Sequence, residues 1–274
     1  MGVALQGVGL IHPGGLTALE GLDLRIEAGE RVAIIGSSGA GKTTLLRLLA
    51  TGLMPTSGQL ILLGEAPTEL RAGALKHLRS RIGLIHQSPP LPPRQRVVTA
   101  VQAGRLGQWS LPRALLSLCY PLDIDGVEQA LAPLDLTEKL FNRCDQLSGG
   151  QLQRVGIARV LYQRAELVLA DEPVAAMDPV LADHTLALLN HLAAERQVTL
   201  VASLHAVDLA LKHFPRVIGL RKGRLHFDCP AAQVTQSLLD SLYANDGLDS
   251  SPSDAMGPAI DVEATAPWAA QRCL

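Results

Sequence analysis

Apolar and charged residues alternate from residue 18 to residue 26. Positions 22, 24 and 26 are leucine or isoleucine and the residues between them are charged, which predicts a half-buried strand. A Glu-Ala-Gly-Glu turn follows, and the apolar run 31–35 predicts a fully buried strand. Residues 42–50 carry leucines on one helical face, so a helix is expected there.

Short apolar runs predict six further strands, at 60–63, 81–85, 167–170, 198–203, 217–220 and 224–227. The proline-rich run 88–93 ends regular structure, and a mostly helical stretch follows it to about residue 145. Another helix is expected from about Gln151 to Leu161. The remainder, 246–274, is acidic and rich in small and turn-forming residues, which predicts a disordered tail.

Composition narrows the class of protein. The chain has 274 residues, enough for a sizeable core, and 47% of them are hydrophobic but only 3% aromatic, so the core must be built from Leu, Ala and Val. The net charge of −2 gives no support for nucleic-acid binding. No apolar run approaches the roughly 20 residues that span a bilayer. No secretion signal is visible, and the scattered cysteines (Cys119, Cys144, Cys229 and Cys273) indicate reduced thiols in a cytosolic protein.

A phosphate-binding loop stands between the strand 31–35 and the helix that follows it. Its residues are Gly36, Ser37, Ser38, Gly39, Ala40, Gly41, Lys42, Thr43 and Thr44, in the pattern G-x-x-x-x-G-K-[ST]. The glycines let backbone N–H groups surround nucleotide phosphates, Lys42 adds positive charge, and the Thr43 hydroxyl is a ligand for Mg²⁺. The alternative is a plain glycine turn, which the flanking strand and helix disfavour.

Two carboxylates end the apolar strand at 167–170. Asp171 is placed to hold Mg²⁺, because hard cations prefer oxygen ligands. Glu172 could deprotonate an attacking water as a general base. Taken alone, the pair could also be a solvated acidic turn, which is the less favoured alternative.

Two further polar residues follow predicted strands. The Gln87 amide, after the strand 81–85, could contact Mg²⁺ or the attacking water. His205, after the strand 198–203, could donate a hydrogen bond to a γ-phosphate. Each would be an ordinary surface residue in isolation. However, the phosphate loop and these residues all follow apolar strands, and the carboxyl ends of parallel strands share one ligand-binding crevice.

A second glycine pair occurs in Leu147-Ser148-Gly149-Gly150-Gln151. Ser148 can cap the helix that follows, and Gly149 and Gly150 let a ligand approach the backbone. A helix start with bare N–H groups is an anion site. Read alone, the segment could be a simple loop-to-helix junction.

Together these motifs resemble the nucleotide-binding subunits of ABC transporters over about residues 3–245. Residues 36–43 match the Walker A loop, Gln87 the Q-loop, and 147–151 the family signature. Residues 167–172 match Walker B, Asp178 belongs to the D-loop, and His205 is the switch histidine. The resemblance implies ATP and Mg²⁺ as cofactors. It also implies a head-to-tail homodimer in which Ser148, Gly149, Gly150 and Gln151 contact the partner's ATP.

The resemblance also implies a fold and an assembly. The fold is an α/β P-loop NTPase core with a parallel sheet, an N-terminal antiparallel β layer and a helical subdomain at about 88–145, within one domain over 1–245. The helical stretch would dock integral membrane permease subunits at the cytoplasmic face of the inner membrane. A finer resemblance, carried by 103–107, 171–175 and 204–210, is to the ATPases of bacterial phosphonate importers. It implies a periplasmic phosphonate-binding protein as an indirect partner.

Several residues depart from the family pattern. His12 stands where an aromatic residue usually stacks on adenine, and it would stack more weakly; a solvated loop histidine is the alternative. Ala175 and Ala176 do not supply the usual D-loop serine, so we expect weaker signalling across the dimer. Gln95 and Arg96 replace more apolar residues in the loop expected to approach the membrane partner.

Other functions are possible for the same residues. An ABC ATPase for another cargo, in import or export, is the runner-up, because cargo never touches this subunit and no residue names it directly. A non-transport ABC ATPase is disfavoured, since the chain has one cassette and no sustained heptads between Lys42 and Asp171. A phosphate-loop kinase would leave the signature unexplained.

Overall fold

A six-stranded sheet forms the centre of the computed structural model, which describes residues 2–244. Its strand order is β5-β6-β7-β3-β8-β9. The strands are β3 (Arg31–Ile35), β5 (Ile82–Ile85), β6 (Leu167–Asp171), β7 (Thr199–Ser203), β8 (Arg216–Arg221) and β9 (Arg224–Pro230). The first five are mutually parallel, as predicted. The edge strand β9 is antiparallel to β8, because a two-residue turn at Lys222 and Gly223 can join only antiparallel strands.

A second sheet confirms the predicted antiparallel layer. Its order is β2-β1-β4, with strands β1 (Val3–Ile11), β2 (Thr17–Ile26) and β4 (Ser57–Leu62). The sequence did not indicate β1. The register of β1 shifts at three places along its pairing with β2, and Gly7 has a φ of 56°. These irregularities break the period-2 pattern by which a strand is recognised.

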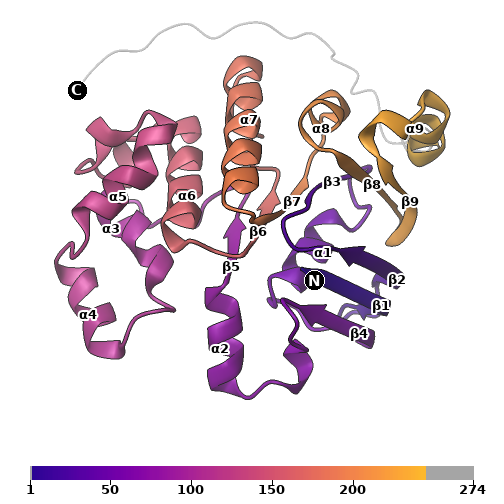
Figure 1. Cartoon of the computed structure of the whole chain (residues 1–274), viewed down its shortest axis with the longest axis horizontal. Helices are drawn as coiled ribbons and strands as arrows, with labels where there is room; N and C mark the ends of the chain where they lie inside the picture. Colours follow the sequence, from indigo (N-terminus) through magenta and orange to yellow (C-terminus); the bar gives the residue numbers. More distant parts are fainter. Residues whose placement is uncertain (1, 245–274) are drawn as a thin grey trace, which may run out of the picture. The chain divides into compact units, whose positions relative to one another are not determined.

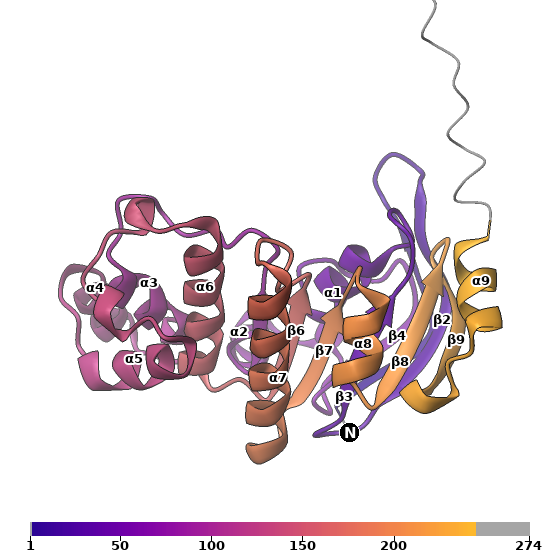
Figure 2. The same cartoon turned by 90° about the horizontal axis from the view of Figure 1, so that it is seen from above.

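The helices cover the sheets and form a group of their own. They are α1 (Lys42–Leu49), α2 (Ala72–Ser80), α3 (Val97–Gln102), α4 (Leu111–Cys119), α5 (Ile124–Leu131), α6 (Gly149–Gln163), α7 (Pro179–Glu195), α8 (Val207–His213) and α9 (Gln236–Tyr243). Figures 1 and 2 place α3, α4 and α5 beyond α6, at the β5 end of the central sheet, with α9 at the other end beside β8 and β9. Within residues 2–244, no helix is both long and apolar enough to cross a membrane.

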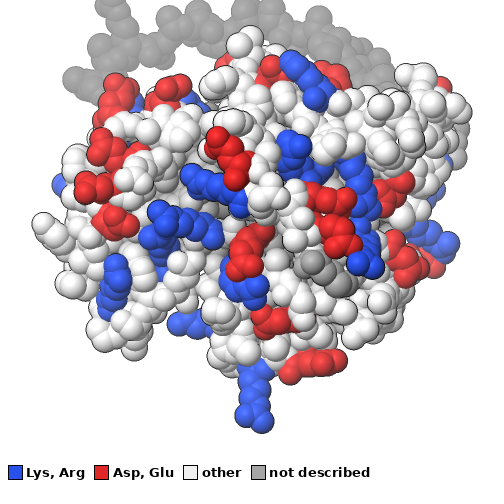
Figure 3. Space-filling model, viewed as in Figure 1, with Lys and Arg blue, Asp and Glu red and all other residues white. Residues whose placement is uncertain are grey.

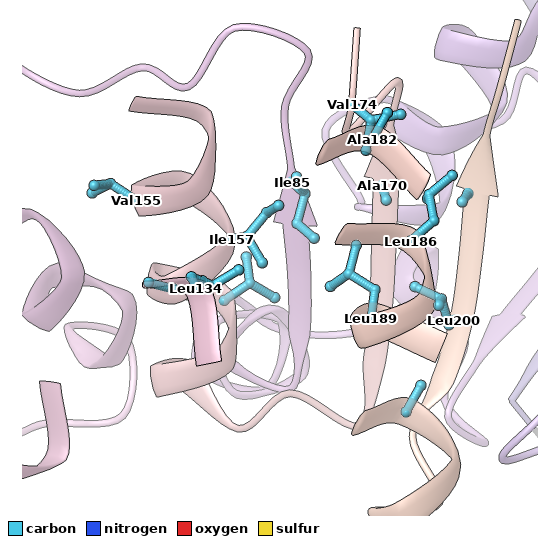
Figure 4. Packing of buried hydrophobic residues seen from close by; sticks show 14 of the residues in the cluster. Ile85, Leu134, Val155, Ile157, Ala170, Val174, Ala182, Leu186, Leu189 and Leu200 are labelled. Atoms are coloured by element: carbon cyan, nitrogen blue, oxygen red, sulfur yellow. The ribbon is translucent and has the colours of Figure 1, made fainter. Parts of the chain in front are cut away.

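Two clusters of buried aliphatic side chains hold these layers together. In one, α6 and α7 pack against the central sheet through residues such as Ile157, Ile85 and Leu189 (Figure 4). In the other, four leucines of α1 lie between the central sheet and the antiparallel layer. Leu, Val, Ile and Ala make up nearly all of both clusters, as the low aromatic content predicted.

The cysteines and the tail were the subject of two predictions. The described cysteines Cys119, Cys144 and Cys229 form no disulfide, and Cys273 lies outside the described residues. The predicted disordered tail, 246–274, also lies outside them.

On the face drawn in Figure 3, acidic and basic side chains are interspersed over the surface.

Candidate functional site

The phosphate loop joins β3 to α1, and its first glycine is required by a close backbone contact. Gly36 has a φ of 151°, and a Cβ on it would lie 2.1 Å from the Leu220 carbonyl oxygen of β8. No side chain caps α1, which begins at Lys42 directly after Gly41. The loop therefore presents backbone N–H groups to a ligand, which is the arrangement that binds phosphate.

Lys42 is buried beneath this loop, with 6% of its surface exposed. Its Nζ donates hydrogen bonds to the carbonyl oxygens of Gly36 at 2.6 Å and Ser37 at 2.9 Å. An ammonium group has three N–H donors, so one remains for a ligand. Burial lowers the pKa of Lys42 below that of an ordinary lysine, and the nearby carboxylates of Glu172 and Asp171 partly oppose this shift.

Asp171, the last residue of β6, accepts hydrogen bonds from two hydroxyl groups. Its Oδ1 accepts hydrogen bonds from Ser203 Oγ at 2.8 Å and from Thr43 Oγ1 at 3.1 Å. Ser203 ends the neighbouring strand β7, is fully buried, and also accepts a hydrogen bond from the Glu172 backbone N–H at 3.1 Å. Ser203 could not be singled out from the sequence, because a serine at a strand end carries no motif of its own.

Glu172 lies next to Asp171 and contacts both other predicted catalytic residues. Its Oε2 accepts a hydrogen bond from Gln87 Nε2 at 2.8 Å, and its Oε1 lies 2.5 Å from His205 Nε2. Its backbone is left-handed, with a φ of 47°, and its side chain is 13% exposed, against 55% for His205. Because β5, β6 and β7 are adjacent, the three residues that follow these strands meet at one point.

A hollow of about 460 Å³ opens in front of the phosphate loop. It is lined by residues 38–44, by Glu172 and His205, and by His12, Leu16, Thr17, Ala18, Lys222 and Gly223. The two last residues form the β8–β9 turn, which is fixed to the loop by a hydrogen bond from Gly223 N to Ala40 O at 2.9 Å. The turn was predicted, because it lies between the strands expected at 217–220 and 224–227. Nothing in the sequence indicated that it packs against the phosphate loop.

Ser148 begins α6 with a reciprocal cap. Its Oγ accepts a hydrogen bond from the Gln151 backbone N–H at 3.3 Å, and the Gln151 side chain accepts one from the Ser148 N–H at 2.9 Å. The helix starts at Gly149, two residues before the predicted start. None of the residues 147–151 lines the hollow in front of the phosphate loop.

Asp178 caps the other long helix near the site. It accepts a hydrogen bond from the Leu181 N–H at 3.0 Å and so fixes the start of α7. Gly150 of α6 lies close to the segment before this cap, since a Cβ on it would be 3.5 Å from the Ala176 carbonyl oxygen. The start of α6 therefore lies beside the segment that precedes α7.

A larger cavity, with a volume of about 630 Å³, lies elsewhere. Residues such as Glu166 and Val198 line it, near the starts of β6 and β7, whereas Asp171 and Ser203 end those strands. The functional site is the smaller hollow, because the phosphate loop, Glu172 and His205 line it.

Comparison with known proteins gives consistent matches. The family model described as "ABC transporter" matches residues 19–175. The chain is 65% identical to the Phosphonates import ATP-binding protein PhnC 1 of Pseudomonas aeruginosa strain PAO1, over 95% of this chain and 98% of that protein. It is 62% identical to the Phosphonates import ATP-binding protein PhnC of Pseudomonas fluorescens strain Pf0-1, over 95% of this chain and 98% of that protein.

Solved structures share the fold. A dimeric post-hydrolysis state of the ATP-binding cassette MJ0796, bound to ADP and Pi, matches with a TM-score of 0.73 and 28% identity, over 84% of this chain and 98% of that chain. A second dimeric structure of MJ0796, described as a bacterial ABC transporter cassette, matches with a TM-score of 0.74 and 27% identity, over the same shares of the two chains.

Proposed function

This chain belongs to the ABC transporter family, and we propose that it is the ATP-binding and ATP-hydrolysing subunit of a phosphonate importer. The observation that carries the proposal is a hollow lined by the phosphate loop, Glu172 and His205. Asp171 and Gln87 are hydrogen-bonded to two of its lining residues, Thr43 and Glu172. The cargo follows from the relatives, which are named as phosphonate import proteins and match almost end to end.

The phosphate loop is suited to ATP. Its backbone N–H groups and the remaining Lys42 donor would hold the β- and γ-phosphates. His12 and Leu16 lie at the rim of the same hollow, where His12 would stack on the adenine. The exposed Lys222 of the β8–β9 turn adds a positive charge to the same rim.

The oxygen atoms beside the loop fit a magnesium ion. Thr43 Oγ1 and Asp171 Oδ1 lie 3.1 Å apart, and hard cations prefer hydroxyl and carboxylate oxygens. These two residues would hold Mg²⁺, with the Gln87 amide oxygen as a further ligand. The ion, when bound, neutralises charge on the phosphates.

Glu172 is the residue best placed to act as a general base. It follows the magnesium residue Asp171 directly, and both of its carboxylate oxygens already contact side chains, those of Gln87 and His205. Each carboxylate oxygen can accept a second hydrogen bond, so an attacking water could still bind to Glu172. Gln87 would then orient the water, while His205 would donate a hydrogen bond to the γ-phosphate.

The signature supports a dimer as the working unit. Ser148, Gly149, Gly150 and Gln151 do not line their own chain's hollow, so a second copy would have to bring them to its nucleotide. The MJ0796 cassette was solved as a dimer. We infer a head-to-tail homodimer in which ATP closes the interface, with Asp178 and its loop between the two sites, and hydrolysis opens it.

The remaining partners follow from the importer assignment. Permease subunits would hold the dimer at the cytoplasmic face of the inner membrane, and a periplasmic phosphonate-binding protein would deliver the cargo. Deleting the gene should abolish growth on a phosphonate as sole phosphorus source while sparing growth on phosphate. Growth on both sources without the gene would point to an ABC ATPase for another cargo.

Two substitutions test the chemistry. Glu172→Gln keeps the shape and should lower ATP hydrolysis roughly 10²- to 10⁴-fold while ATP-dependent dimerisation persists. Ser148→Arg should leave ATP binding by the monomer intact but block dimer closure and hydrolysis. Normal turnover in Glu172→Gln would remove Glu172 as the base, and normal turnover in Ser148→Arg would remove the shared site.

A further inference from the structure

A buried glutamine links the signature helix to the strand end that carries Gln87. Gln153 of α6 is 1% exposed, and its Nε2 donates a hydrogen bond to the His86 carbonyl oxygen at 2.8 Å. Its own Oε1 is buried without a hydrogen-bond partner among the described residues. The side chain is therefore held in the interior by one directed contact, which burial makes costly to lose.

That contact acts on the peptide group next to Gln87. The His86 carbonyl and the Gln87 backbone N–H belong to the same planar peptide unit. A hydrogen bond that fixes this plane also fixes the N–Cα bond of Gln87, and so restricts where its side chain can lie. Gln87 Nε2 in turn donates to Glu172 Oε2 at 2.8 Å. The contacts thus run from Gln153 through one peptide plane to the predicted general base.

A second contact of α6 lies on the other side of Gln87. A Cβ on Gly156 would lie 2.8 Å from Pro89 Cγ, so the helix and the loop touch closely there. Gln153 and Gly156 are three residues apart and share one face of α6. Their partners on the loop, His86 and Pro89, lie on either side of Gln87 in the sequence. The Gln87 segment therefore rests on α6 at two points.

We propose that Gln153 is a positioning residue, which couples the signature at the start of α6 to the placement of Gln87. The inference rests on the proposed ATPase function. Gln153 lies just over one helical turn beyond Ser148, so a shift of α6 when the signature meets a partner's nucleotide also shifts the peptide before Gln87. Through this contact, closure of one site sets the position of the amide that contacts Glu172 in the other.

The test compares two buried glutamines. Gln153→Met removes the donor at nearly constant volume and should lower the ATP hydrolysis rate about tenfold, the effect of one lost buried hydrogen bond. Gln102→Met is the matched control, because Gln102 of α3 is also 1% exposed but neither of its amide atoms has a hydrogen-bond partner within residues 2–244. It should leave hydrolysis within about twofold of the unmodified protein. Both variants should keep the same ATP affinity.

A double substitution separates positioning from general structural damage. In a Gln87→Ala background, with residual turnover followed by release of labelled phosphate, Gln153→Met should have no further effect, since residues that act through one another are not additive. An equal loss in both backgrounds would overturn the proposal, and so would normal hydrolysis in the single variant.

A second variant allows the proposal to be tested even if the Gln153→Met protein does not fold. Gly156→Ala should also slow hydrolysis, because its methyl group would displace Pro89 and the adjoining loop. Gly73→Ala is its control, since a Cβ on Gly73 of α2 would meet nothing within 4 Å. Full activity in Gly156→Ala would count against the inference. If Glu172→Gln is inactive while the Gln153 and Gly156 variants hydrolyse normally, the coupling fails and the proposed function stands.

Discussion

Ser203 is predicted to be the main structural support of the two carboxylates. It is fully buried at the end of β7, donates a hydrogen bond to Asp171 Oδ1 at 2.8 Å and accepts one from the Glu172 N–H at 3.1 Å. Ser203→Ala removes both bonds and adds no new group. The Asp171 oxygen then keeps only the longer contact with Thr43.

The size of the effect follows from these contacts. A hydrogen bond to a carboxylate contributes about 1.5–3 kcal/mol. The low end applies, because Asp171 is partly exposed to water. The Glu172 N–H also contacts the Ser203 carbonyl oxygen at 3.2 Å, so losing the hydroxyl costs it little. We expect a loss of about 2 kcal/mol, which lowers the melting temperature by about 4–8 °C for a domain of this size.

The measurement is thermal unfolding by calorimetry without nucleotide, with Ser117→Ala as the control. Ser117 is also a buried serine, but its hydroxyl bonds only the Ala114 carbonyl one turn back in α4, at 2.7 Å. Alanine favours a helix, so Ser117→Ala should change the melting temperature little. Equal melting temperatures for the two variants would refute the argument that Ser203 holds the carboxylates.

Three further predictions concern single side chains. ATP affinity should fall as pH rises through the lowered pKa of Lys42, since only the ammonium form of this side chain binds phosphate. Titration calorimetry at a series of pH values should show the affinity falling at a pH below the pKa of an ordinary lysine. Lys42→Arg should remove this pH dependence. Burial and a hydrogen bond to Asp123 raise the pKa of Tyr162 to about 12, so this bond should stabilise the fold up to about pH 10 and weaken above it. Tyr162→Phe should cost about 1–2 kcal/mol in urea unfolding at pH 7 and abolish that alkaline loss. His12→Tyr should tighten ATP binding measured by fluorescence titration, and an unchanged affinity would exclude stacking by His12.

Much of the fold could be predicted because the central strands are short, apolar and bounded by turn residues. β3 was predicted to the residue, and the predicted family and fold class are confirmed by the family match and by the two cassette structures. The helix α7 was not predicted, although Asp178 and Pro179 are both helix-start signals. Apolar residues are spread around this helix, so it lacks the one-sided pattern by which a surface helix is recognised.

The site was predictable where a residue type carries its own chemistry and not where it depends on packing. The phosphate loop, Asp171, Glu172, Gln87 and His205 could be identified because carboxylates, an amide and a histidine after apolar strands are unusual together. Ser203 and Gln153 could not. A serine and a glutamine are common residue types, and only the pairing of β6 with β7 and the seating of α6 give these two a role.

The register of the central sheet ties this chemistry to the core. Asp171 is paired with Ser203, and Ile34, two residues before the phosphate loop, is paired with Ser203 on its other side. A slip of one residue would turn every side chain of β6 to the opposite face. It would bury Asp171 among leucines and carry it away from Thr43. The buried Leu167 and Leu169 oppose such a slip, because it would move both out of the packed layer that they share with α1. The aliphatic core therefore specifies the positions of the site's carboxylates to within one residue. This is why Thr43 and Ser203, far apart in the sequence, both reach Asp171 within hydrogen-bonding distance.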